Sequence, residues 1–414
     1  MGKLAITGGK PVRTKPFPKW PCYGQGESKL LAEVIESGIW GGYNTKVSEF
    51  ENAFAEYCDT KQCILSVNGT VTLVCALISC DVMPGDELIV TPISFISTAS
   101  SVLLAGAIPV FVDIESDTYN IDPDKIEKAI TERTKAIIPV HFSGQPANMT
   151  KINEIAKKNK LYVIEDAAHA HGAEWQGKRV GSIGDFGSFS FQNTKLLTCG
   201  EGGALTTNDP DLADKARSYF NQGREKGRGW FEHFILGTNC RISAFQAAVL
   251  IEQFKKLPEE NERRKTNIEY IIKKIKGIDG LIPLKIRPEV TYPVYYIFSG
   301  KYIQEKFDGI PKETFFKALE LEGIPKPEFY PYPLYKNPVF NHPDLRKPGN
   351  PLHLAHRNSP TDYDKLYLPE SEKAIKEGFW LAHQTFLGTT KDMDDIAEAI
   401  IKIRENTNEL KNIK

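Results

Sequence analysis

The chain has 414 residues, of which 41% are hydrophobic, so it is long enough to bury a sizeable core and to form more than one domain. Its 52 basic and 53 acidic side chains nearly cancel, and no block of lysines and arginines stands out. This balance gives no electrostatic basis for binding nucleic acid or an anionic membrane, so small molecules are the expected partners.

No apolar run reaches the ~18 residues that a membrane span needs, and the start of the chain shows no signal-peptide core. We therefore expect a cytoplasmic protein. The seven cysteines include no C-x-x-C pair, which favours buried free thiols over disulfides or metal ligands. No cluster of His, Cys and Asp has metal-ligand spacing, so no metal site is expected.

Residues 1–25 are rich in proline, glycine and lysine and have no sustained hydrophobic period, which predicts an arm packed on the surface. Helical spacing of apolar residues then predicts helices over about 27–37 and 47–57. From about residue 63 to 207, short apolar runs alternate with helical stretches, which indicates a mostly parallel sheet with helices on both faces. The predicted strands are 63–67, 87–91, 108–112, 136–140, 161–166, 188–191 and 204–206.

Two side chains stand where ligands are usually bound in such sheets. Asp166 ends a buried apolar strand, and Lys195 follows an alternating strand just before Gly-Glu-Gly-Gly at 200–203. Ligands of open α/β sheets bind beyond the carboxyl ends of the strands. A lysine that forms a Schiff base and a carboxylate that keeps a ring nitrogen protonated are what pyridoxal phosphate requires.

Two earlier strand ends carry weaker signals. Asn-Gly-Thr at 68–70 opens a helix whose start would present free backbone N–H groups to a phosphate, although such a turn is more often a plain helix cap. Phe95 follows the next strand, where a lone aromatic usually belongs to the core. His141 and His171 receive no role from the sequence.

After the large α/β domain, predicted as 26–257, Pro258 interrupts a long helical pattern and marks a domain junction. A strand over 290–298 and helices over 312–321 and 393–406 predict a smaller α+β domain spanning 258–414. Its Pro/Tyr-rich loop contains Tyr330, Tyr332 and Tyr335, for which lining a sugar-sized pocket and simple loop packing are equally good readings.

Taken together, Asp-Ala-Ala-His-Ala-His-Gly at 166–172 and Phe-Gln-Asn-Thr-Lys-Leu-Leu-Thr-Cys-Gly-Glu-Gly-Gly at 191–203 resemble the motifs of the DegT/DnrJ/StrS sugar aminotransferases. The branch that looks most similar contains the glutamine-dependent scyllo-inosose aminotransferases and 3-amino-5-hydroxybenzoate synthase. The resemblance implies a type I aminotransferase fold, pyridoxal 5'-phosphate as cofactor, and a homodimer with composite sites.

The resemblance also assigns roles residue by residue. Lys195 would carry the cofactor, Asp166 would protonate its ring nitrogen, and Phe95 would stack on the ring. His169 stands where the family often has glutamine and would contact the ring hydroxyl, since either side chain can donate a hydrogen bond. The phosphate ligands implied are Gly69, Thr70, Ser190 and, from the neighbouring subunit, Asn239.

The function implied is a ping-pong transamination from glutamine or glutamate to a keto-cyclitol or a nucleotide-linked ketosugar. A dehydratase or aromatising enzyme like 3-amino-5-hydroxybenzoate synthase remains an alternative, because that synthase keeps the lysine. A non-catalytic pyridoxal-binding regulator is a third reading, against which stands the lack of a helix-turn-helix extension or basic patch. A nicotinamide dehydrogenase would need a G-x-G-x-x-G after the first strand, and the chain has none.

Overall fold

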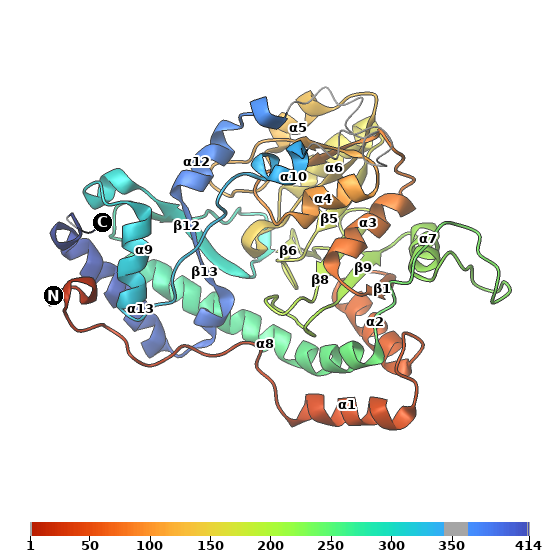
Figure 1. Ribbon diagram of the computed structural model, residues 1–414, viewed down its shortest axis with the longest axis horizontal. Coiled ribbons are helices and arrows are strands. Elements are labelled where there is room, and N and C mark those ends of the chain that lie inside the picture. The colour runs from red at the N-terminus through yellow and green to blue at the C-terminus, as the bar shows by residue number, and fades with distance from the viewer. Residues whose placement is uncertain (1, 343–362, 412, 414) are drawn as a thin grey trace.

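Figure 1 shows the computed structural model of the chain, which describes residues 2–342, 363–411 and 413. A seven-stranded sheet forms its centre, as expected, and each of the seven strands predicted for it lies within two residues of the observed one. The sheet is parallel except at β9, which is antiparallel to both of its neighbours. Across the sheet, the strands are β1 (Gln62–Ser66), β9 (Gly203–Thr207), β8 (Phe186–Ser190), β5 (Tyr162–Asp166), β4 (Thr134–Ile138), β2 (Glu87–Val90) and β3 (Ile108–Phe111).

Helices cover both faces of this sheet because successive residues of each strand point to opposite sides. Ile138 and Ile164 pack with one group of helices, whereas their neighbours Ile137 and Val163 pack with the other. The first face carries α3 (Gly69–Ser79), α4 (Ser97–Leu104) and α7 (Pro210–Phe220). The second carries α2 (Thr45–Tyr57), α5 (Pro123–Ala129), α6 (Met149–Asn159) and the first part of α8 (Ala244–Ile275).

Helix α8 runs through the residue that was expected to interrupt it. Pro258 lies inside one continuous helix of 32 residues, so the predicted interruption is wrong. Ser243 caps the start of the helix, where its hydroxyl and the Gln246 side chain form a reciprocal capping box. Along its length α8 contacts α1 (Gln25–Ser37), α2 and α13 (Thr390–Glu405), and this packing outweighs the hydrogen bond that proline cannot make. The division into 1–25, 26–257 and 258–414 stays a prediction, and Met1, 343–362, 412 and 414 lie outside the described residues.

The C-terminal part of the chain builds a second core around a small antiparallel sheet, β10-β12-β13. The expected strand over 290–298 is two strands, because Pro293 separates them. The first pairs with β6 in a separate sheet, β11-β6-β7, and the second joins the small sheet. The elements are β6 (Glu174–Trp175), β7 (Lys178–Arg179), β10 (Leu281–Pro283), β11 (Val290–Tyr292), β12 (Ile297–Tyr302), β13 (Gly378–Ala382), α9 (Lys312–Leu321), α10 (Pro338–Asn341) and α12 (Pro369–Glu377).

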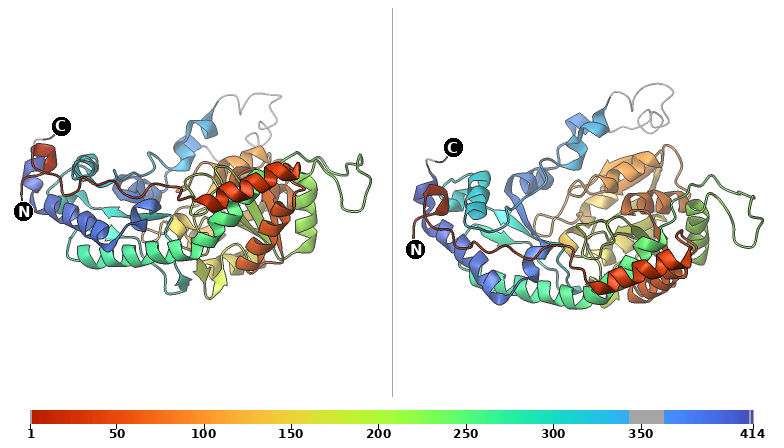
Figure 2. Two further views of the ribbon diagram at one scale, coloured as in Figure 1. Left: turned by 90° about the horizontal axis from the view of Figure 1, so that it is seen from below. Right: turned by 60° about the horizontal axis from the view of Figure 1, so that its bottom comes forward.

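The N-terminal arm starts against this C-terminal core and ends at α1, at the other end of the molecule (Figures 1 and 2). Leu4 is fully buried in the C-terminal core. Arg13 is also buried, and its guanidinium lies 2.7 Å from both Asp392 and Asp395 of α13. The arm is therefore anchored by a buried charge cluster, which goes beyond the surface packing expected from its composition.

The loop between α7 and α8 projects away from the body of the molecule (Figure 2). It ends near Asn239 and exposes a run of large apolar side chains: Trp230, Phe231, Phe234, Ile235 and Leu236. A protruding apolar loop of this kind is typical of a segment that packs against another chain.

All seven cysteines are free. Cys58, Cys63, Cys75, Cys80 and Cys240 are buried, as the sequence indicated, whereas Cys22 and Cys199 are only partly buried. Within the described residues, no helix combines the length and the apolar character that a membrane crossing requires.

Candidate active site

The two residues singled out by the sequence lie at the same edge of the sheet. Strands β5 and β8 run parallel and pair so that Asp166 is opposite Ser188. Asp166 is the last residue of β5, and Ser190 is the last residue of β8. Because Lys195 follows β8 closely, the topology brings the predicted lysine and the predicted acid to one end of neighbouring strands.

Asp166 is a buried acid whose carboxylate accepts two hydrogen bonds. The Thr98 hydroxyl, on α4, donates to Asp166 Oδ2 at 2.7 Å, and the Ala168 amide donates to Oδ1 at 3.3 Å. Burial raises the pKa of Asp166, while the Thr98 hydrogen bond and the nearby charge of Lys195 act to lower it. Thr98 was not predicted from the sequence, because a hydroxyl inside a helix gives no signal of its own.

The start of α3 lies directly against the end of β8. A Cβ on Gly69 would lie 2.8 Å from Ser190 Cβ, so only glycine allows this approach. The Asn68 side chain caps the helix by accepting from the Val71 amide at 2.9 Å. The amides of Gly69 and Thr70 have no acceptor among the described residues, so the helix start presents two free N–H donors beside the Ser190 hydroxyl.

Lys195 points at an aromatic ring. Its Nζ lies 4.3 Å from the centre of the Tyr296 ring, and the Tyr296 ring stacks on His169 at 4.2 Å. Within the part of the chain that the structure describes, no acidic side chain forms an ion pair with Lys195. A half-buried amine that is not held in a direct ion pair is available for chemistry.

His169 also has an unsatisfied atom. Its ring is buried, and Nδ1 finds no hydrogen-bond partner among the described residues. Burial holds the pKa of His169 well below its usual range, with the charges of Lys195 and His171 adding to the effect, so the ring is neutral at ordinary pH. Buried polar atoms usually have a hydrogen-bond partner, so an unpaired nitrogen in this site indicates that a further polar group binds there.

The remaining predicted ligands lie in exposed loops. Phe95 follows β2 and is 59% exposed, so it is not a core residue in the single chain. Asn239 is exposed at the root of the projecting loop, where its backbone bridges to Asn221. The structure describes one chain, and in it neither residue is enclosed by its neighbours.

The tyrosine-rich loop divides into two parts. Tyr335 is fully buried and donates a 2.6 Å hydrogen bond to Glu372, so the pocket reading is wrong for this residue. Tyr330 packs on Trp380, with ring centres 4.8 Å apart, and lies 6.5 Å from the Phe142 ring, which in turn neighbours His169. Tyr332 is 39% exposed.

The two histidines without a predicted role are buried in the interior of the protein. His141 donates through Nε2 to Glu165 at 2.9 Å and accepts from the Ala147 amide, which makes it a structural residue. His171 packs between the rings of Phe189 and Phe191. Burial lowers the pKa of His171 to about 3, so this ring stays neutral.

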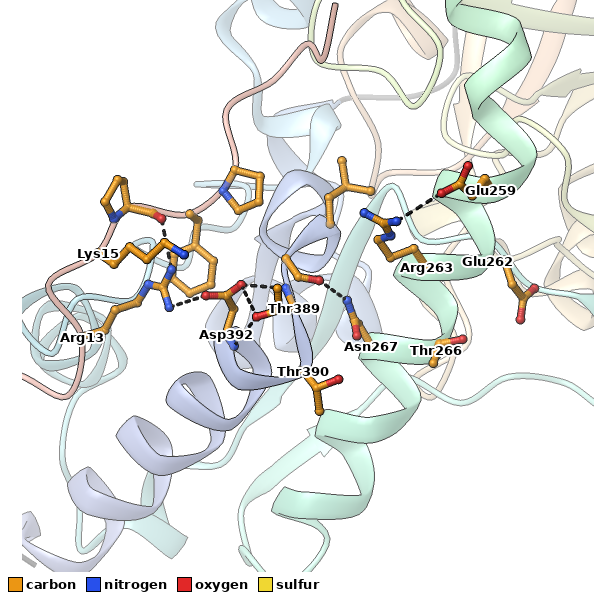
Figure 3. Close-up of a pocket in the computed structure, with 15 residues that line it drawn as sticks. Arg13, Lys15, Glu259, Glu262, Arg263, Thr266, Asn267, Thr389, Thr390 and Asp392 are labelled. Carbon is orange, nitrogen blue, oxygen red and sulfur yellow. Dashed lines mark hydrogen bonds and ion pairs between the residues drawn. The ribbon is translucent and has the colours of Figure 1, made fainter.

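A separate cleft of about 800 Å³ lies between the arm, the middle of α8 and the start of α13 (Figure 3). Its walls mix basic and acidic side chains, and Arg263 is already paired with Glu259 at 3.1 Å. Lys195 and Asp166 do not line it, so it is not the site described above. Among the described residues, no group of His, Cys, Asp and Glu could hold a metal ion.

The chain is similar to known proteins over nearly its whole length. Residues 21–401 match the profile of the DegT/DnrJ/EryC1/StrS aminotransferase family. The chain is 35% identical to an L-glutamine:2-deoxy-scyllo-inosose aminotransferase of Streptoalloteichus tenebrarius, covering 99% of both chains. It is also 35% identical to the L-glutamine:scyllo-inosose aminotransferase of Streptomyces griseus, covering 98% of this chain and 99% of that relative.

Among solved structures, 3-amino-5-hydroxybenzoic acid synthase superposes with a TM-score of 0.83 at 31% identity, over 94% of this chain and 99% of that one. This likeness confirms the expected type I aminotransferase fold. The chain belongs to the DegT/DnrJ/EryC1/StrS aminotransferase family and is a pyridoxal-phosphate-dependent aminotransferase.

Proposed function

We propose that this aminotransferase transfers the amino group of glutamine to a keto-cyclitol of the inosose type. Two relatives that span almost the whole chain are named for glutamine as donor and an inosose as acceptor. Glutamate and nucleotide-linked ketosugars, the other substrates expected from the sequence, have less support from these relatives. The observation that carries the proposal is the meeting of Lys195 and Asp166 at one sheet edge beside the free start of α3.

The residues at this edge fit pyridoxal phosphate. When bound, the cofactor supplies an aldehyde that condenses with amines and a ring that withdraws electrons from the substrate. Lys195 would hold the cofactor covalently through Nζ, and the Asp166 carboxylate would accept the hydrogen bond of the ring nitrogen. The free amides of Gly69 and Thr70 and the Ser190 hydroxyl would hold the phosphate.

Two further side chains would fix the plane of the ring. Phe95 is exposed in the single chain and offers its face for stacking. The buried Nδ1 of His169 has no protein partner and would be satisfied by a polar group of the cofactor, as the resemblance suggests for the ring hydroxyl. Both features reduce the stability of the chain without the cofactor, since they expose an aromatic ring and leave a buried nitrogen unpaired.

Lys195 would also move the proton. Once the donor amine has displaced it, its Nζ can take a proton from the substrate carbon as a base and return it as an acid. The amine lies over the face of the Tyr296 ring, 4.3 Å from its centre. The site therefore has one group that can serve both halves of a transamination.

Absorbance spectroscopy tests the donor assignment. Glutamine added to the loaded enzyme without acceptor should convert the cofactor to pyridoxamine phosphate, and a keto-inosose should then restore the original spectrum. A failure of glutamine, glutamate and alanine to change the spectrum would refute the proposed transamination.

A second function has one specific observation in its favour, the likeness to 3-amino-5-hydroxybenzoic acid synthase. Both reactions need a group that removes a proton from the substrate, a role that Lys195 would fill, and a leaving hydroxyl in the substrate would then decide between amination and loss of water. An aminocyclohexenone that loses water on this enzyme, without a glutamine half-reaction, would assign the chain to the synthase type.

The composite site is part of the same proposal. The projecting loop with its apolar side chains would pack on a second copy, and Asn239 at its root would contact the partner's phosphate site. Mixed dimers of Lys195→Ala and Asn239→Ala test this directly. If Asn239 acts across the interface, each mixed dimer contains one complete site and regains activity, whereas an Asn239 that acts within its own chain gives no rescue.

A further inference from the structure

The segment that carries Lys195 has little structure of its own. Residues 192–198, here called the lysine loop, form irregular turns between β8 and the Gly-rich segment. Asn193 and Thr194 are exposed, and Lys195 itself is half-buried. Leu196 and Leu197 are buried in the core just after Lys195, and within the loop the Lys195 amide donates to the Gln192 carbonyl at 2.8 Å. The exposed residues 193 and 194 lack such core packing, so contacts from outside the loop bear on where they lie.

Two side chains from distant parts of the chain provide these hydrogen bonds. The Trp20 indole, at the end of the N-terminal arm, donates through Nε1 to the Asn193 carbonyl at 2.8 Å. His383, which follows β13, donates through Nε2 to the Thr194 carbonyl at 3.0 Å. The two carbonyls immediately before Lys195 are therefore each held by an aromatic N–H group.

The two donors are also held against each other. The Trp20 ring meets the His383 ring edge-on, with centres 4.6 Å apart and planes at 85°. His383 is buried, and burial together with the charge of Arg264 keeps its pKa well below the usual range. The ring is therefore neutral, and because its acceptor is a carbonyl oxygen, the single ring proton must be on Nε2.

A third residue, Tyr296, contacts both the loop and the lysine side chain. The Tyr296 hydroxyl lies 3.0 Å from the Thr194 hydroxyl, and the face of the same ring lies under Lys195 Nζ. Tyr296 stacks on His169, so the aromatic row runs from the cofactor site to the arm. Each of the three residues 193, 194 and 195 thus has a partner outside the loop.

The far end of the arm is fixed as well. Arg13 is tied to Asp392 and Asp395, and its amide donates to the Glu322 carbonyl at 3.0 Å. Past Arg13 the arm forms one wall of the cleft in Figure 3 before it reaches Trp20. Trp20 is therefore presented to the lysine loop by a segment that is anchored on the C-terminal core.

We propose that Trp20 and His383 are positioning residues for Lys195, and that they hold the lysine loop so that Nζ meets the cofactor aldehyde. The proposal rests on the proposed role of Lys195. Neither residue needs to touch the cofactor, because both donate their hydrogen bonds to backbone carbonyls of the loop. Their effect should therefore fall on the covalent attachment of the cofactor and spare its noncovalent binding.

Cofactor capture by the apoenzyme separates these two steps and needs no substrate. Attachment of pyridoxal phosphate to Lys195, a condensation that releases one water, is followed by stopped-flow absorbance. Pyridoxamine phosphate cannot condense with a lysine, so its dissociation constant reports the phosphate and ring contacts alone. The variants are Trp20→Phe, which keeps a ring but removes the donor, His383→Phe, and His383→Gln, which keeps an N–H donor.

We expect attachment to slow by about tenfold in Trp20→Phe and His383→Phe, as small displacements of reacting groups commonly do. The dissociation constant of pyridoxamine phosphate should stay within about twofold, and His383→Gln should recover most of the attachment rate. The matched control is Trp175→Phe, which removes an indole hydrogen bond to Thr150 far from the lysine loop and should leave attachment unchanged.

Attachment at the wild-type rate in both Trp20→Phe and His383→Phe would refute the positioning role. A parallel loss of attachment and of pyridoxamine phosphate binding would also refute it, since general disruption would then explain the data. If His383→Phe does not fold, Trp20→Phe decides alone. Borohydride reduction and peptide mapping test separately whether Lys195 carries the cofactor. A label on another lysine would refute the proposed role of Lys195 itself.

Discussion

Thr98 donates a 2.7 Å hydrogen bond to Asp166, and Ser94 lies 2.7 Å from the same Thr98 hydroxyl. Since Thr98 gives its proton to the carboxylate, Ser94 must donate to Thr98. This short relay stabilises the charged form of an acid whose pKa burial raises. In the role proposed for it, Asp166 must be charged to hold a protonated ring nitrogen, so the relay would bear on activity.

Replacing Thr98 by valine removes the donor and keeps the shape. The pKa of Asp166 should rise further, because the effect of burial, which raises it most, is then less compensated. The acid limb of the kcat/KM profile should therefore move to higher pH, with a loss of about tenfold near its midpoint, as expected for losing a hydrogen bond to a charged group. Thr98→Ser keeps the hydroxyl and should leave the profile in place, and an unmoved acid limb in Thr98→Val would contradict the role of the relay.

Gly69→Ala should weaken cofactor binding. Its Cβ would lie 2.8 Å from Ser190 Cβ and 3.3 Å from the Phe189 carbonyl, so the start of α3 must move away from the end of β8. We expect the dissociation constant of pyridoxamine phosphate to rise at least about tenfold, since the phosphate loses well-placed donors. Gly277→Ala, where an added Cβ meets nothing within 4 Å, is the control, and equal affinity in the two variants would argue against a phosphate site here.

Buried histidines should make stability fall in mild acid. His171 has a folded-state pKa of about 3 against an ordinary value of 6.5, so between these values the unfolded chain binds a proton that the folded chain does not. The stabilising contribution of the neutral ring is complete above pH 6.5 and is lost as the pH falls below it. His171→Leu should reduce the pH dependence of the free energy of unfolding by up to about 1.4 kcal/mol per pH unit in this window.

Urea unfolding midpoints at several pH values between 7.5 and 4 measure this effect. His233→Gln changes an exposed histidine and serves as the control. The raised pKa of Asp166 acts in the opposite direction, but it is common to all the variants and cancels in the comparison. Parallel curves for wild type and His171→Leu would show that His171 does not carry the acid sensitivity.

The two tyrosines of the Pro/Tyr loop should respond differently to substitution. Tyr335→Phe removes a hydroxyl that donates to Glu372 and accepts from the Leu368 amide, so stability should fall by about 1–3 kcal/mol with kcat/KM intact. Tyr330→Phe keeps the ring packed on Trp380 and removes only the hydroxyl, so it should raise the KM for the keto acceptor with little change in stability, because this ring lies on the Phe142 side of the site. Differential scanning calorimetry and steady-state kinetics measure the two effects, and a reversed pattern would place Tyr335 in the pocket.

Local sequence pattern predicted most of the sheet and its site. Buried apolar runs such as 161–166 and alternating runs such as 186–190 mark strands because side-chain period depends only on neighbouring residues. Asp166 and Lys195 could be found for the same reason, since both follow the end of a recognisable strand. The Asn-Gly-Thr turn at Gly69 was found as a helix start, and the structure adds the close contact with Ser190 that requires glycine.

Local propensity misled at two prolines. Pro258 was expected to interrupt a helix, yet α8 continues through it because the helix is packed on its neighbours along its length. Pro293 was placed inside a strand, yet the chain breaks there and joins two different sheets. A proline removes one backbone donor in either setting, and only the surrounding packing decides whether the element tolerates the loss.

The sequence by itself determined the sheet, the candidate residues Asp166 and Lys195, and the helix start beside them, because each depends on a short stretch of chain. Only the tertiary structure decided what surrounds these residues. Thr98 reaches Asp166, and Trp20 and His383 reach the lysine loop, from segments that carry no pattern linking them to the site. Such contacts depend on the path of the whole chain, and a hydrogen bond between distant residues leaves no trace in the local order of either.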